Sequence, residues 1–226
     1  MAKVAGEKPL SQAVEERRAT PSFEDIPIHS ADLEKIIRAG LAAPSSYNLQ
    51  PWRFVVVRER EQKKKLRVAA FNQAKVEEAS VVIVACGDAQ GWRDGDMEEV
   101  IRMGKEHGGA GEAQAERLRA SVTRIFGGAP GQAGGLQPSF DLWANRHVMI
   151  AFTTMMWTAE TLGYDTAPME GFEEDKIKAL LKIPDRVRVV ALLGIGRRRG
   201  PDKAFAGRFE PARVVFAEEW GRGIEF

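Results

Sequence analysis

The segment SVVIVACGD, residues 80–88, constrains the fold more than any other part of this chain. Six apolar residues follow one another without a polar break, and most of them are β-branched, as strand residues often are. Successive strand residues point to opposite faces, so an unbroken apolar run indicates a strand that is covered on both faces. We therefore expect an interior strand with helices packed on both sides of its sheet, in a layered α/β or α+β fold.

The patterns on either side of this segment fit the same layered arrangement. WRFVVVRE (52–59) and RVRVVALLGIG (186–196) are rich in β-branched residues and predict two further strands. Apolar residues at helical spacing and runs of helix-forming residues predict helices that begin near residues 11, 30, 60, 139 and 172. The expected N-caps are Ser11, Ser30 and Ser139, while Pro44 and Gly163 are expected to end the second helix and the longest helix.

Composition and motif searches exclude several classes of protein. The formal net charge is only +1, which gives no argument for binding to nucleic acid or to an anionic membrane. The single cysteine, Cys86, excludes an internal disulfide, and its apolar surroundings predict a buried structural thiol. No run reaches the ~18 apolar residues of a membrane span, and the N-terminus lacks the apolar core of a secretory signal, so a cytoplasmic protein is expected. The three histidines show no metal-ligand spacing, and no serine or cysteine lies in a nucleophile motif.

Glycine is concentrated in the middle of the chain. Residues 104–135 hold nine of the 22 glycines, eight of them in the clusters HGGAG and GGAPGQAGG. Between these clusters, Leu118, Val122, Ile125 and Phe126 keep helical spacing. The region is either a flexible insertion or a mobile lid over a site, and the sequence alone leaves both open.

Polar residues gather where the expected helices and strands end. Arg17 and Arg18 follow the first helix, and guanidinium groups can bind phosphate through two hydrogen bonds. The loop between Pro44 and Pro51 carries hydroxyl and amide side chains that both donate and accept hydrogen bonds, as a uracil-like edge requires. Asn72 with Lys75, and Glu170 with Gly171, stand beside further predicted strands. Each group taken alone is also compatible with ordinary turns and solvated charges.

Taken in order, these groups resemble the FMN-dependent nitroreductase family. The similar segments are ERRATPSFEDIPI, APSSYNLQPWRFVVV, FNQAKVEEASVVIVACGD and LGYDTAPMEGF. The resemblance implies one α+β domain over residues 1–226, an α/β/α sandwich around a central mixed, mainly antiparallel sheet. It also implies a Gly-rich insertion or lid at about 93–138 and a C-terminal extension at about 212–226. Members of the family are homodimers that hold two FMN molecules at the subunit interface.

The resemblance also assigns the cofactor-binding positions. Arg17 and Arg18, together with Arg208 in AGRFEP, should bind the phosphate and ribityl part of FMN, next to the position of Ala19. Asn72 and Lys75 should reach the pyrimidine edge of the isoalloxazine, while Glu170 and Gly171 should lie beside the ring near N5. The partner subunit should contribute the loop residues Pro44, Ser45, Ser46, Asn48 and Gln50.

The implied activity is a ping-pong oxidoreductase reaction. Hydride passes from NADH or NADPH to FMN, and then to a nitroaromatic, a quinone or a similar electron-poor acceptor. No catalytic side chain is expected, because the cofactor carries the reactive atom and the protein supplies orientation and electrostatics. The alternatives are a specialised flavin enzyme of the same fold, such as a reductive dehalogenase or a flavin-degrading enzyme, and a flavin-binding protein without turnover.

The chain departs from the family pattern at three positions. Ala19 stands where a serine is usual, Pro21 where a cation beside flavin N1 and O2 is usual, and Ala206 where a further basic residue is usual. We therefore predict that Lys75 alone stabilises the negative charge of reduced flavin. Arg197–Arg199 are expected to be a solvated run, with a phosphate-binding role as the alternative.

Overall fold

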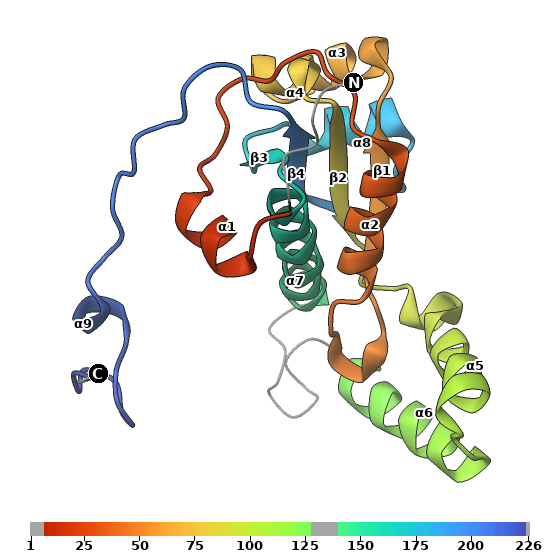
Figure 1. The fold of residues 1–226 in the computed structure, drawn as a ribbon. Helices are drawn as coiled ribbons and strands as arrows, with labels where there is room; N and C mark the ends of the chain where they lie inside the picture. Colours follow the sequence, from red (N-terminus) through yellow and green to blue (C-terminus); the bar gives the residue numbers. More distant parts are fainter. Residues whose placement is uncertain (1–6, 128–139, 225–226) are drawn as a thin grey trace.

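Four strands form the centre of the fold in the computed structural model, which describes residues 7–127 and 140–224. They are β1 (Trp52–Val57), β2 (Val81–Gly87), β3 (Asp165–Met169) and β4 (Arg188–Gly196). Their order in the sheet is β1-β2-β4-β3, and every neighbouring pair is antiparallel (Figure 1). An isolated parallel bridge joins Ala19 to Thr166 of β3. The prediction of an α+β fold with a mixed, mainly antiparallel sheet is confirmed.

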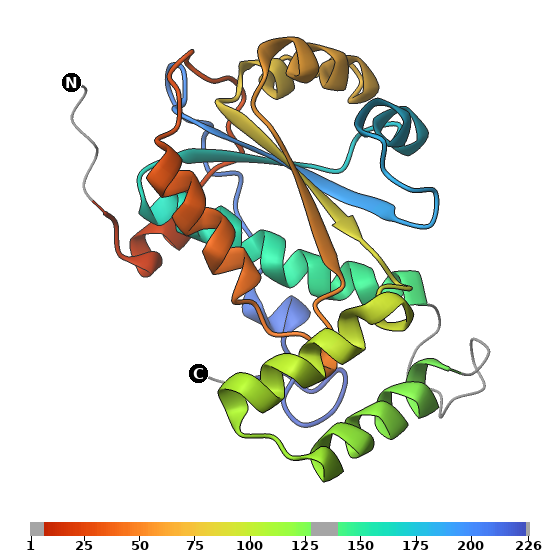
Figure 2. The ribbon, with the colours of Figure 1, turned by 90° about the vertical axis from the view of Figure 1, so that its right-hand side faces the viewer.

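Helices cover both faces of this sheet, because β2 is apolar on both sides. Val81, Ile83 and Ala85 pack against α2 (Ser30–Leu41) and α7 (Phe140–Thr161). The alternate residues of β2 pack against α3 (Arg60–Ala69), α4 (Ala74–Glu78) and α8 (Glu174–Leu181). Figure 2 shows the two helical layers with the sheet between them. The apolar run of β2, which predicted an interior strand, therefore contributes side chains to two separate hydrophobic cores, one on each face of the sheet.

Helix ends agree only in part with the sequence prediction. Two of the predicted N-caps are wrong, because Pro9 precedes α1 (Leu10–Glu16) and His29 precedes α2 at the capping positions. Neither helix has a side-chain cap bond. The C-terminal stop of α7 is confirmed, since Gly163 follows the helix with a φ of 79°, a conformation that favours glycine. The third predicted cap, Ser139, lies outside the described residues.

The middle of the chain is helical where the structure describes it. A short π-type turn, η2 (Trp92–Asp96), leads into α5 (Met97–Gly108), and α6 (Glu112–Phe126) returns beside it (Figure 2). Val122 and Phe126 are buried against Trp92 and Trp143, so the helical spacing seen in the sequence is confirmed. The flexible insertion and the lid over a site both stay predictions for this region. Most of the second glycine cluster, within residues 128–139, lies outside the described part.

The C-terminal segment leaves the body of the molecule after β4. It contains one short helix, α9 (Pro211–Val214), and its residues from 201 to 215 are exposed. Figure 1 shows this segment passing the end of α1 and running away from the sheet. Within residues 7–127 and 140–224, no helix has both the length and the apolar character that crossing a membrane requires.

Candidate functional site

The loop between α2 and β1 is held in an unusual backbone conformation. It contains the short 3-10 turn η1 (Ser46–Asn48), and Tyr47, Asn48 and Gln50 have φ angles of 56°, 56° and 45°. Non-glycine residues rarely adopt this left-handed region, and strained backbone tends to gather at ligand sites. The Ser45 Oγ accepts a hydrogen bond from the Gln50 amide at 3.0 Å, which helps to hold the loop.

The second segment with this strain is the connection between α3 and α4. Phe71 and Asn72 have φ angles of 52° and 57°. Among the described residues, these two and the three loop residues make up five of the seven non-glycine positions with positive φ. Both segments coincide with predicted cofactor-binding positions. The remaining two, Lys182 and Glu218, lie elsewhere.

The α3–α4 connection lies against the end of β3. Gln73 Nε2 donates a hydrogen bond of 2.9 Å to the Gly171 carbonyl. A Cβ atom added at Gly171 would lie 3.6 Å from the Phe71 ring, so the two segments touch. Asn72 and Glu170 are exposed beside this contact. The structure thus brings together the two pairs that the sequence placed at the flavin ring.

Two of the predicted phosphate-binding arginines also come together, although they lie near opposite ends of the chain. The guanidinium carbons of Arg18 and Arg208 lie 4.5 and 5.3 Å from the centroid of the Phe205 ring. Arg18 donates to the carbonyl oxygens of Glu15 and Arg17, and Arg208 donates to that of Gly207. Within the described part of the chain, neither arginine forms an ion pair with a carboxylate.

Two lysines form a second pair of cations, which the C-terminal segment connects to the first, because Lys203 lies two residues before Phe205. Burial lowers the pKa of Lys75 from its usual value, and the nearby positive charge of Lys203 lowers the pKa further. Across the described residues, neither lysine has a carboxylate partner. Arg18, Arg208, Lys75 and Lys203, called the cation cluster below, therefore combine like charges without a counter-ion from the described chain. Such an arrangement suits an anionic ligand.

Arg17 points in a different direction from Arg18. Its guanidinium lies 5.6 Å from the centroid of the Trp157 ring on α7. Its Nε and Nη1 atoms are buried, and they have no hydrogen-bond partner in the described structure. Buried donors are rarely left unpaired, so these atoms are available to a bound anion. The structure therefore fits a phosphate-bearing group at the end of α1.

Glu160 is the buried acid behind Arg17. Burial raises the pKa of its carboxyl to about 7, and it accepts a hydrogen bond of 2.6 Å from the Thr166 hydroxyl, which acts against that increase. Ala19 contributes backbone only, through its bridge to Thr166, and the next amide, that of Thr20, donates to the Thr166 carbonyl at 2.9 Å.

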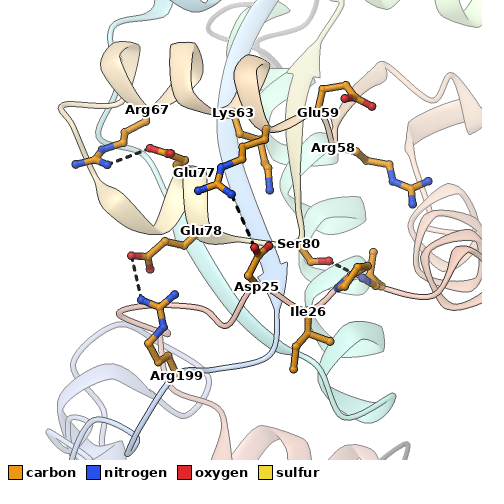
Figure 3. Close-up of a pocket in the computed structure, with 13 residues that line it drawn as sticks. Asp25, Ile26, Arg58, Glu59, Lys63, Arg67, Glu77, Glu78, Ser80 and Arg199 are labelled. Carbon is orange, nitrogen blue, oxygen red and sulfur yellow. Dashed lines mark hydrogen bonds and ion pairs between the residues drawn. The ribbon is translucent and has the colours of Figure 1, made fainter. Parts of the chain in front are cut away.

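A larger polar cleft lies elsewhere and contains none of the predicted site residues. It has a volume of about 610 Å³ and is drawn in Figure 3. Three of its four arginines have carboxylate partners: Arg67 with Glu77 at 3.1 Å, Arg199 with Glu78 at 3.6 Å and Arg60 with Asp25 at 3.9 Å. Its buried Lys63 donates to the Ala79 carbonyl at the end of α4, a position where a helix favours a cation. These internal pairings account for most of the charged lining without a ligand.

No alternative chemistry emerges from the other candidate residues. Burial raises the pKa of the Cys86 thiol to about 12, so this cysteine is the inert structural thiol that its sequence context predicted. In the ranges that the structure describes, no cluster of three or more histidine, cysteine, aspartate or glutamate residues could hold a metal ion.

Comparison with known proteins decides the family. The sequence profile of the Nitroreductase family matches residues 14–197, which is most of the chain. The chain belongs to the nitroreductase family. Among its relatives, the NADH dehydrogenase of Thermus thermophilus is 34% identical over 180 residues, covering 80% of this chain and 82% of that protein. Protein DrgA of a Synechocystis species is 29% identical over 187 residues, covering 82% of each protein.

A solved structure supports the same assignment for this nitroreductase-family chain. A chain from Exiguobacterium sibiricum 255-15, solved in complex with FMN, superposes with a TM-score of 0.84 and 25% sequence identity. The match covers 96% of this chain and 100% of that chain. The α/β/α sandwich predicted from the resemblance is therefore confirmed as the nitroreductase fold.

Three residues that contact the candidate site were missed in the sequence. Lys203 and Phe205 lie on the C-terminal segment, and only the path of that segment past α1 brings them to the cation cluster. His147 on α7 bonds to the Ser46 loop, but its place within an apolar helix hid this contact. The sequence does show a basic residue, Lys203, three residues before Ala206. Its spacing along an extended segment, however, does not predict which side chains it contacts.

The arginine run after β4 is only partly solvated, and its partners lie outside the cation cluster. Arg197 lies over the Tyr164 ring, at 4.7 Å, and donates to the Gly163 carbonyl. Arg198 pairs with Asp165 at 3.4 Å and with Asp202 at 3.3 Å, and Arg199 pairs with Glu78. The prediction of a solvated run is wrong for Arg197 and Arg198, which are partly buried and fix the exit of β4 to a neighbouring segment, whereas Arg199 is exposed as predicted.

Proposed function

We propose that this nitroreductase-family protein is an FMN-dependent oxidoreductase that uses NADH or NADPH as its electron donor. The observation that carries the proposal is the cation cluster, whose four positive groups have no carboxylate partner in the described chain, next to the strained segment at Asn72. The FMN complex of the Exiguobacterium chain and the name of the Thermus relative support the choice of cofactor and donor.

The phosphate of FMN would be held at the end of α1. Arg18 and Arg208 would bind it from two segments, with Phe205 keeping the two guanidinium groups in place. The unpaired buried donors of Arg17 offer further hydrogen bonds from the α7 side. Since Ala19 has no hydroxyl, the proposed phosphate site depends on these arginines.

The ring system would lie against the α3–α4 connection and the end of β3. Asn72 and Lys75 would face the pyrimidine edge, and Glu170 and Gly171 would flank the ring near N5. A cavity of about 320 Å³ next to Glu170, lined also by Met149 and Phe152, leaves space on this side of α7. The chemistry supplied by bound FMN is hydride transfer from NAD(P)H to a nitroaromatic, quinone or similar electron-poor acceptor, with donor and acceptor using one site in turn.

A second copy of the chain would complete the site. β2 begins next to α4 and Lys75, and it ends opposite Trp52, which follows the Ser45–Gln50 loop. At ~3.3 Å per residue, its seven residues separate these two groups by about 20 Å. One chain therefore cannot bring both Lys75 and its own Ser45–Gln50 loop to the same edge of one flavin ring. The loop of a partner subunit can lie there instead.

Exposed apolar side chains support the same homodimer. The C-terminal segment exposes Phe209, Val214 and Trp220, the last of them 90% exposed, and α1 exposes Leu10 and Val14. A segment that leaves its own subunit with apolar side chains uncovered fits against another subunit. The hairpin of α5 and α6, joined to the Ser46 loop through the edge contact of Phe126 with Tyr47, would border the acceptor side of the site.

Titration of the apoprotein with FMN and with riboflavin tests the phosphate site. We expect Arg18→Gln and Arg208→Gln each to weaken FMN binding about tenfold or more, as loss of a charge-assisted hydrogen bond does. Riboflavin lacks the phosphate, so its affinity should hardly change. Arg188→Gln, which removes an exposed arginine paired with Glu174, is the matched control. Equal losses for FMN and riboflavin, or FMN affinity unchanged in both variants, would contradict the assignment.

A further inference from the structure

The strained loop before β1 is anchored by a histidine from a distant helix. The Ser46 amide donates a hydrogen bond of 3.1 Å to His147 Nε2, and the Ser46 hydroxyl lies 3.0 Å from the same nitrogen. The other ring nitrogen, Nδ1, lies 2.8 Å from the Trp143 carbonyl, one turn earlier on α7. One imidazole therefore connects the loop to the helix.

These partners determine which form of His147 fits. A backbone carbonyl only accepts hydrogen bonds, so Nδ1 carries the proton. A backbone amide only donates, so Nε2 presents its lone pair to Ser46. A doubly protonated imidazolium would place an N–H group against the Ser46 N–H group. The neutral ring therefore accepts from the Ser46 amide, whereas the charged ring can donate only to the Ser46 hydroxyl and loses the bond from the amide.

The loop depends on this anchor because its own backbone is strained. Tyr47, Asn48 and Gln50 all have positive φ, which costs free energy that surrounding contacts must offset. Within the loop, the described side-chain hydrogen bonds are Gln50 to Ser45 Oγ and Gln50 Nε2 to the Asn48 carbonyl. Those bonds fix Gln50. The Ser46 carbonyl accepts from the Leu49 amide at 3.1 Å, and His147 is the side chain that holds the Ser46 amide.

Few charges face His147 from the elements around it. The loop has no ionisable side chain except Tyr47 between Pro44 and Pro51, and Arg53 at the start of β1 is paired with Asp96 at 2.7 Å. On α7, Arg146 is exposed, and the ring contact of His147 is with Trp143, at 5.1 Å between centroids. Phe126 reaches it from α6 only through Trp143, at 4.8 Å. In the described structure, no carboxylate is bonded to His147 to hold a positive charge there.

We propose that His147 is a positioning residue that makes FMN binding depend on pH, by accepting the Ser46 amide only while its imidazole is neutral. The inference rests on the proposed function, in which the Ser45–Gln50 loop closes over the flavin of the partner subunit. Protonation of His147 breaks its bond to the Ser46 amide and lets the strained loop relax. Proton binding and FMN binding then oppose each other, so FMN affinity falls as the pH is lowered.

The test is the FMN dissociation constant of the dimeric apoprotein at pH 8 and at pH 5.5. FMN has a phosphate that titrates near pH ~6, so wild type is compared with His147→Gln, in which that contribution is the same. Glutamine can still accept the Ser46 amide but does not titrate. We expect wild type to lose about tenfold more affinity than His147→Gln between the two pH values, a usual size for the coupling between two binding events.

Two further variants complete the design. His147→Phe should bind FMN weakly at both pH values, because it removes the acceptor, and His29→Gln, an exposed histidine away from the loop, should behave as wild type. If His147→Gln keeps the whole pH dependence of wild type, the inference is wrong. If wild type binds no FMN even at pH 8, the proposed function fails first, and the inference fails with it.

Discussion

At the scale of single residues, Lys203 changes the prediction made for Lys75. The sequence left Lys75 as the only cation near flavin N1 and O2, because Pro21 and Ala206 replace basic residues of the family pattern. In the structure, Lys203 lies close enough for its charge to lower the pKa of Lys75. Two lysines, rather than one, would therefore stabilise the negative charge of reduced FMN.

Redox titration distinguishes stabilisation of reduced FMN by Lys75 alone from stabilisation by Lys75 and Lys203 together. We expect Lys75→Met and Lys203→Gln each to bind reduced FMN about tenfold less tightly relative to oxidised FMN, which corresponds to a midpoint potential about 30 mV lower for a two-electron couple. Lys176→Gln, an exposed lysine paired with Glu173, should leave the potential unchanged. A normal potential in Lys203→Gln, together with a lowered one in Lys75→Met, would restore Lys75 as the sole cation.

Glu160 gives a prediction about stability rather than binding. Its pKa in the folded chain, about 7, lies above the ordinary glutamate value of 4.5, so the folded protein binds more protons than the unfolded one between these pH values. Stability should therefore fall as the pH rises through that window. Glu160→Gln keeps an acceptor for Thr166 and removes the titration. The variant should gain roughly 1–3 kcal/mol relative to wild-type apoprotein between about pH 4.5 and pH 8 in urea denaturation. If the stabilities of wild type and Glu160→Gln change in parallel with pH, the raised pKa of Glu160 is contradicted.

At the scale of elements, the contact of α2 with α7 depends on a glycine. A Cβ atom at Gly40 would lie 2.5 Å from Cγ of Met155, which is itself fully buried. Gly40→Val should therefore destabilise the fold by about 1–3 kcal/mol through overpacking. Gly108→Val, at the end of α5 with no described atom within 4 Å of the added Cβ, is the control and should cost much less. Chemical denaturation of both variants gives the comparison, and equal costs would contradict the close packing.

The elements also show what the sequence could and could not predict. β2 and the end of α7 were predictable, because an unbroken apolar run and a glycine stop act through local chemistry. The N-caps were not, since Ser11 and Ser30 lie inside the first turns of their helices. Arg197–Arg199 look solvated in sequence, but each finds a partner on a segment distant along the chain. For the same reason His147 and Lys203 escaped prediction: tertiary packing alone brings them to the site.

At the scale of the whole molecule, assembly and cofactor binding should be coupled. Because the two halves of the proposed site lie at opposite ends of β2, the monomer holds only part of the contacts. We expect the protein to sediment as a dimer, and removal of residues 211–226 to weaken both dimerisation and FMN affinity. Sedimentation velocity with detection of the flavin absorbance measures both together. A truncated monomer that sediments with FMN fully bound would contradict a shared site.

The most direct test of the central claim is the visible spectrum of the protein reconstituted with FMN, recorded anaerobically while NADH or NADPH is added. The account predicts a bound flavin spectrum that bleaches with at least one of the two donors and returns when a quinone or nitroaromatic is added. A protein that binds FMN but is not bleached by either donor would be a flavin-binding protein without this turnover. A protein that cannot be reconstituted with FMN would contradict the account as a whole.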